Sequence, residues 1–120
     1  MNYKKNEIKQ YIFDELNNYS WTEIINIKDD FSELHNELFN IDYYLIGYYQ
    51  CEKWLNNRTF DAISYIQEYE KDNFGECYTD FTSSEKVVNM YVYIIGEEIL
   101  SELLYTRNGL LELYKNHKRS

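Results

Sequence analysis

The sequence contains no proline, four glycines and a single alanine, Ala62, among its 120 residues. Without proline, no rigid X-Pro bond interrupts a helix, and turns must be made by Gly, Asn, Asp and Ser. There is also no Pro-, Gly- or Ser-rich stretch that would mark a linker. We therefore expect residues 1–120 to form a single domain around one core.

Cysteine and histidine are equally scarce. Cys51 and Cys77 lack CxxC spacing, and His35 and His117 stand far apart. Such scattered ligands do not match a zinc site, and two thiols without that spacing are typical of a reduced, cytosolic chain. The sequence leaves open whether the two cysteines lie near each other or near His35.

Motifs of catalysis are missing as well. The chain has no phosphate-binding glycine loop, no G-x-S-x-G elbow and no dinucleotide fingerprint. We expect no catalytic residue, no metal and no cofactor, and hence a protein that is not an enzyme.

Long apolar runs are absent too. Lys4 and Lys5 are followed by Glu7 and Lys9 instead of the apolar stretch of a signal peptide, and no run is as long as a membrane span. We expect a cytoplasmic protein, in the host cell cytoplasm if a phage encodes it.

What the chain does have is acid. Asp and Glu outnumber Lys and Arg by 21 to 12, although the 13 Asn, 12 Ile and 14 Tyr are typical of a low-GC genome, which would also enrich Lys. The net charge of the chain is −9. Because residues 1–9 carry a charge of +2 and residues 107–120 a charge of +3, residues 10–106 carry a charge of −14. An anionic surface repels nucleic acid and membranes and attracts cationic proteins. We therefore expect a protein partner with a cationic, nucleic-acid-binding surface, and no direct binding of nucleic acid or membrane.

Apolar residues at three- and four-residue spacings predict a mainly α, compact helical domain. The expected helices span about 3–18, 43–55, 60–73, 83–107 and 110–116, with Asn108-Gly109 as a stop signal. A further helix is expected to start at Phe31, with Asp30 as its cap. The helix at about 83–107 is apolar nearly all round from Val87 to Ile95, so we expect it at the centre of the core, opened by a capping box of Thr82 and Glu85.

Two segments leave strand and helix open. A short strand or hairpin is possible near 21–27 or 76–81, although Ser20 and Glu23 resemble a capping box that favours a helix at 21–27. Gly75 is expected in the left-handed conformation that follows a helix end. Gly47 and Gly96 both fall inside expected helices, which suggests that those two helices cross closely at their glycines.

Acidic residues cluster on two of the expected helices. Asp61, Glu68 and Asp72 fall within about 40° on a helical wheel, opposite the apolar Phe60, Ile63 and Phe74. A second cluster follows on the central helix, and the segment between them ends in an expected loop. The candidate partner-binding residues are Asp61, Glu68, Tyr69, Glu70, Asp72, Glu76, Asp80, Glu97, Glu98 and Glu102. The alternative is that these carboxylates form an ordinary solvated face.

The stretches 36–47, 68–76 and 85–98 resemble an uncharacterised family of small acidic proteins from phages and plasmids of low-GC bacteria, over residues 30–104 or so. This resemblance implies a genomic setting and not a mechanism. In size and acidity the chain is also similar in general to anti-CRISPR and anti-restriction inhibitors, some of which imitate DNA.

These likenesses imply a mobile-element inhibitor that binds a host nucleic-acid-dependent defence enzyme through an acidic surface. With 12 basic residues retained, a local acidic patch, or partial DNA mimic, is expected in place of a full imitation of a duplex. The alternative is a non-enzymatic structural or adaptor protein of a phage or plasmid. The oligomeric state, monomer or homodimer, stays open.

Overall fold

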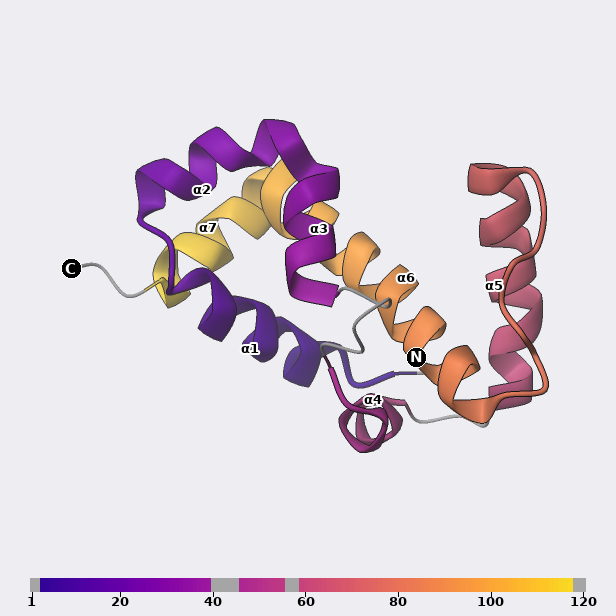
Figure 1. Cartoon of the computed structure of the whole chain (residues 1–120). Helices are drawn as coiled ribbons and strands as arrows, with labels where there is room; N and C mark the ends of the chain where they lie inside the picture. Colours follow the sequence, from indigo (N-terminus) through magenta and orange to yellow (C-terminus); the bar gives the residue numbers. More distant parts are fainter. Residues whose placement is uncertain (1–2, 40–45, 56–58, 118–120) are drawn as a thin grey trace.

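The computed structural model describes residues 3–39, 46–55 and 59–117, with the backbone alone for residues 28 and 59–61. Within these ranges the chain is helical and has no β-strand, which confirms the mainly α fold (Figure 1). The elements are α1 (Lys5–Leu16), α2 (Trp21–Ile27), the 3-10 turn η1 (Lys28–Asp30), α3 (Phe31–Phe39), α4 (Tyr48–Trp54), α5 (Thr59–Phe74), α6 (Ser84–Tyr105) and α7 (Arg107–Asn116).

Helix α6 is the centre of the core, as its apolar circumference predicts. Thirteen of its 22 residues are buried, and it contacts α1, α3, α4, α5 and α7. In Figure 1, α1, α2, α3 and α7 gather around its C-terminal half, while α4 and α5 lie toward its N-terminal half. All residues from Val87 to Val92 are buried, whereas Glu98 and Glu102 further along the same helix are exposed.

The start of α6 lies one residue later than the expected capping box. Ser83 is the N-cap, and its hydroxyl accepts a hydrogen bond from the Lys86 amide at 3.3 Å. Thr82 is wrong as the cap because its own amide and hydroxyl both donate to Asp80, at 3.0 and 2.6 Å. The aspartate thus closes a local turn that competes with the box.

The break between α6 and α7 lies at Thr106 and not at Asn108-Gly109, so that expected stop signal is wrong. Thr106 is extended (φ −111°, ψ 150°), and its hydroxyl caps α7 by accepting from the Gly109 amide at 2.9 Å. A Cβ at Gly109 would lie 2.0 Å from the carbonyl oxygen of Glu102. The glycine is therefore needed where α7 folds back tightly against the end of α6.

The expected crossing of two helices at Gly47 and Gly96 is also wrong. Gly47 is the N-cap of α4, and a Cβ there would meet nothing within 4 Å. Gly96 does mark a close approach, but to α3: a Cβ would lie 2.7 Å from the ring of Phe39. The expected helix 43–55 is thus described only from Tyr48 onward, and residues 43–45 lie outside the described ranges.

The two ambiguous segments resolve without strands. Ser20 and Glu23 form the reciprocal capping box, with amide-to-side-chain distances of 3.0 and 3.1 Å, and open α2. Residues 75–83 form an irregular connection from α5 to α6, which begins at Gly75 in the left-handed region (φ +82°). Figure 1 shows this connection returning along α5.

Candidate partner-binding surface

Helix α5 buries a different face from the one that its sequence predicts. Ala62, Ile66 and Glu70, spaced by four residues, are the buried positions, whereas Phe74 is exposed. On a wheel of about 100° per residue these three positions lie about 40° to 120° from Phe74, so the prediction that Phe74 belongs to the core face is wrong. Glu68 and Asp72 remain exposed, and the side chain of Asp61 lies outside the described part of the chain.

Among the candidate contact residues whose side chains are described, Glu70 alone is fully buried, at 2% exposure. Its carboxylate accepts hydrogen bonds from the Tyr78 amide at 3.3 Å, the Thr79 amide at 3.2 Å and the Thr79 hydroxyl at 3.2 Å. Assigning Glu70 to a partner is therefore a mistake. It is a positioning residue, which fixes the returning connection against α5.

The last residue of α5 and the connection that follows it expose two aromatic side chains that a folded core would normally bury. Phe74 is 48% exposed and Tyr78 is 64% exposed, and their rings meet edge to face with centroids 5.8 Å apart. Asp72, Glu76 and Asp80 are also exposed and alternate with these two aromatic residues along the chain. We call these five residues the α5 tip.

The tip is held from below. Tyr69, half-buried, contacts Phe74 edge to face at 6.1 Å, and Glu70 fixes the backbone of Tyr78. Asp80 accepts two hydrogen bonds from Thr82, which lower the pKa of its carboxyl and keep it ionised. The acidic and aromatic groups are thus presented on a fixed backbone.

Glu97 and Glu98 are not free charges. Glu97 accepts a hydrogen bond from the Tyr69 hydroxyl and Glu98 one from the Tyr65 hydroxyl. Partial burial raises the pKa of Glu98. The pKa of Tyr69 is raised mainly by burial and, to a smaller extent, by the hydrogen bond to Glu97. These two pairs fasten α5 to α6.

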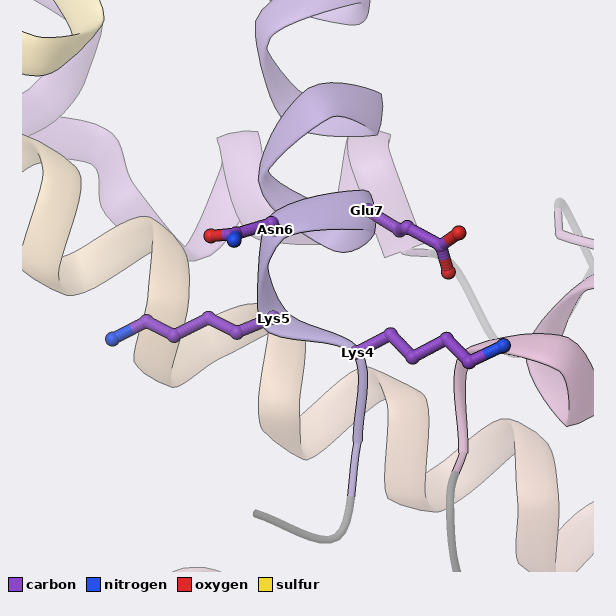
Figure 2. A pocket seen from close by; sticks show the side chains of 4 residues that line it. All are labelled: Lys4, Lys5, Asn6 and Glu7. Carbon is purple, nitrogen blue, oxygen red and sulfur yellow. The ribbon is translucent and has the colours of Figure 1, made fainter.

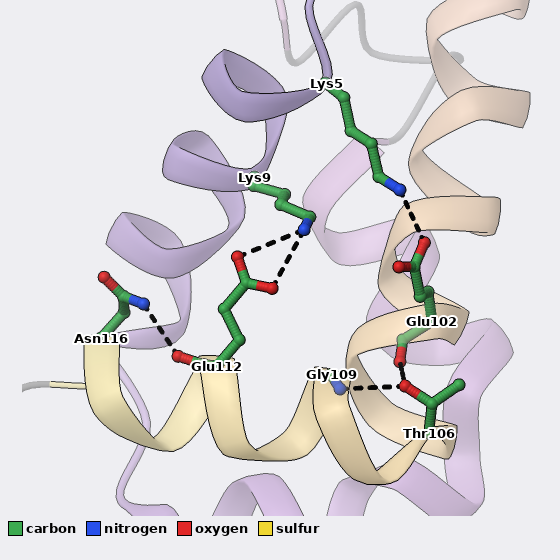
Figure 3. A network of polar contacts seen from close by, with 7 residues as sticks. All are labelled: Lys5, Lys9, Glu102, Thr106, Gly109, Glu112 and Asn116. Atoms are coloured by element: carbon green, nitrogen blue, oxygen red, sulfur yellow. Dashed lines mark hydrogen bonds and ion pairs between the residues drawn. The ribbon is translucent and has the colours of Figure 1, made fainter.

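Glu102 is likewise engaged within the chain. It forms an ion pair with Lys5 of α1 at 2.9 Å, which lowers the pKa of its carboxyl, and Lys9 pairs with Glu112 of α7 at 3.0 Å (Figure 3). Two of the N-terminal lysines thus join α1 to α6 and α7. The second acidic cluster of the sequence is therefore separate from the α5 tip and largely structural.

No family model, curated protein or solved structure matches the chain. The surface must therefore be read from its own residues.

The two cysteines are free thiols in different surroundings. Cys51 is buried and its thiol lies 3.2 Å from the amide oxygen of Asn89, and burial raises its pKa to about 12. Cys77 is exposed, and His35 sits between Phe31 and Tyr93 in a site where burial lowers its pKa. Among the described residues, no group of three or more His, Cys, Asp or Glu side chains is placed to hold a metal ion.

A hollow of about 370 Å³ near the start of α1 is lined by Lys4, Lys5, Asn6 and Glu7. Figure 2 shows these side chains diverging, with Lys5 and Asn6 on one side of the helix and Lys4 and Glu7 on the other. They do not converge on a common ligand.

In the described ranges, no helix has the length and apolarity that crossing a bilayer requires.

Proposed function

We propose that this protein is a non-catalytic inhibitor that binds a cationic, nucleic-acid-binding surface of another protein through the α5 tip. The observation that carries the proposal is the exposed Phe74–Tyr78 pair, with which the exposed Asp72, Glu76 and Asp80 alternate along the chain. Aromatic side chains supply most of the energy of many protein interfaces, and the surrounding carboxylates select a basic partner.

Charge supports the same direction. The body of the chain, residues 10–106, carries −14, and a cleft that evolved to bind phosphates is strongly anion-seeking. Asp72, Glu76 and Asp80 supply three negative charges on a fixed backbone, which is the scale of a local patch and not of a DNA duplex. The tip would cover one part of such a cleft as a partial DNA mimic.

The resemblance to small acidic phage and plasmid proteins and to anti-CRISPR and anti-restriction inhibitors supports a particular class of partner. We infer a host defence enzyme that depends on nucleic acid, such as a Cas effector or a restriction enzyme, met in the host cytoplasm. Neither direct nucleic acid binding nor a catalytic step belongs to this proposal.

The test is capture from lysates of low-GC bacteria that carry CRISPR and restriction systems, using the immobilised protein and eluting with excess DNA. We expect a Cas or restriction subunit that DNA displaces. Phe74→Ser should lose this subunit, while Tyr49→Ser, which changes another exposed aromatic residue on α4, should retain it. Recovery of a partner that DNA cannot displace would contradict the proposal.

A homodimeric structural or adaptor protein is the second candidate. Three large side chains, Tyr105, Leu111 and Tyr114, are exposed around the α6–α7 corner at 53%, 49% and 38%. Large exposed apolar side chains favour self-association. Sedimentation equilibrium would show a dimer that Leu111→Glu dissociates; a monomer at all concentrations would exclude this candidate.

A further inference from the structure

A second concave surface lies between α1 and α4, away from the α5 tip. It is an open groove of about 440 Å³, lined by Glu7, Tyr11, Asp14, Ile46, Gly47, Gln50 and Trp54. We propose that this groove binds an arginine side chain presented by a partner polypeptide. The proposal is independent of the function proposed for the tip.

The apolar part of the groove is aromatic and fixed. The rings of Tyr11 and Trp54 lie 5.3 Å apart, and the Tyr11 hydroxyl donates to the carbonyl oxygen of Leu38 at 2.5 Å. Because that hydroxyl is committed to α3, Tyr11 presents its ring and not a polar group to the groove. An aromatic ring attracts a guanidinium group and packs against its aliphatic stem.

The polar part of the groove is acidic. Glu7 lies one turn before Tyr11 and Asp14 one turn after it, on the same side of α1. Gln50 adds an amide group from α4. Among the described residues that line the groove there is no lysine or arginine, and Lys5 and Lys9 are paired with Glu102 and Glu112. Lys4 lies on the same side of α1 as Glu7 (Figure 2), so the two carboxylates and this one cation leave a net negative charge at the groove.

The spacing favours an organic cation over a metal ion. Two residues seven apart on a helix are separated by about 10 Å along its axis, whereas a Ca²⁺ ion needs ligand oxygens at about 2.3–2.6 Å. A guanidinium group on a long stem can lie over the ring of Tyr11 with Glu7 and Asp14 at either end. Its planar donors also suit carboxylate acceptors better than an ammonium group does.

The test uses the peptide acetyl-Gly-Arg-Gly-amide and ¹⁵N NMR of the full chain. We expect shift changes confined to the amides of the groove, with a dissociation constant on the order of 1 mM, as for one exposed cation site. The citrulline peptide, which has the same shape without the charge, should cause no shifts. If it binds as well as the arginine peptide, the proposal is overturned.

Variants locate the site. Glu7→Gln combined with Asp14→Asn should weaken binding at least about fivefold, while Glu33→Gln on exposed α3 surface should leave it unchanged. The tip variant Asp72→Asn should also leave it unchanged, so a failure of the tip proposal would not be mistaken for a failure of this one. Shifts that map to the α5 tip, or that survive the double change, would overturn the groove site.

Discussion

Replacing Glu70 with alanine should destabilise the protein by about 2–3 kcal/mol, because its buried carboxylate is the acceptor for the Tyr78 amide and for the amide and hydroxyl of Thr79. A hydrogen bond to a charged group contributes about 1.5–3 kcal/mol. The full sum is not expected, since Tyr78 and Thr79 lie near solvent and water can replace part of the loss. Glu70→Gln retains one acceptor oxygen and should cost about 1 kcal/mol.

Urea unfolding provides the assay, with Glu68→Ala as the matched control. Glu68 lies two residues away on the same helix but is exposed, so its removal should change stability by less than about 0.5 kcal/mol. Amide hydrogen exchange adds a local readout: Tyr78 and Thr79 should exchange faster in Glu70→Ala. Equal stability of the two alanine variants, with unchanged exchange at these amides, would refute the role assigned to Glu70.

Three further predictions concern stability. Gly109→Ala should lower the free energy of unfolding in urea by about 2 kcal/mol, despite the helix-propensity gain of about 1 kcal/mol, because the added Cβ would strike backbone atoms. Gly47→Ala, where the added Cβ has open space, should change it by no more than about 0.5 kcal/mol. Equal effects of the two changes would contradict this packing. Tyr69→Phe should cost about 1 kcal/mol through loss of its bond to Glu97, and unchanged unfolding would show that the bond contributes nothing. Burial lowers the pKa of His35 below 6.5, so the contribution of this histidine to stability is present above pH 6.5 and is lost as the pH falls through the lowered pKa. The His35→Phe variant should therefore lose less stability than the parent between pH 7 and pH 5. Identical curves of stability against pH for the two proteins would refute this.

The fold could be predicted from the sequence where helical spacing and local polar chemistry decide it. The apolar circumference of 87–95 identifies the central helix, and the Ser20–Glu23 box identifies α2. The end of a helix is harder to predict where two local hydrogen-bonding signals compete. Asp80 engages Thr82 and moves the cap of α6 to Ser83, and this choice depends on loop geometry that the sequence does not display.

The candidate site could be predicted only in part. The exposed acids Asp72, Glu76 and Asp80 follow from composition and turn signals. The burial of Glu70 does not, because a carboxylate is buried only when tertiary structure brings donors to it, here eight and nine residues further along the chain. The exposure of Phe74 does not follow from the sequence either, because Ala62 and Ile66 occupy the buried positions of α5.

The glycines carry a related lesson. Each interior glycine had to have a packing reason, but the partner surface is set by helices distant in sequence. Gly96 receives the ring of Phe39, and Gly109 receives the backbone at the end of α6. Sequence spacing cannot show which of several glycines meets which helix.

The central claim, that the α5 tip binds a cationic partner, is tested most directly by charge reversal in the capture experiment. Asp72→Lys with Glu76→Lys changes the tip, and Asp29→Lys with Glu33→Lys makes the same change in net charge at exposed positions elsewhere. We predict that the parent and the second variant retain a DNA-displaceable partner and that the tip variant loses it. Equal capture by all three proteins would contradict the claim.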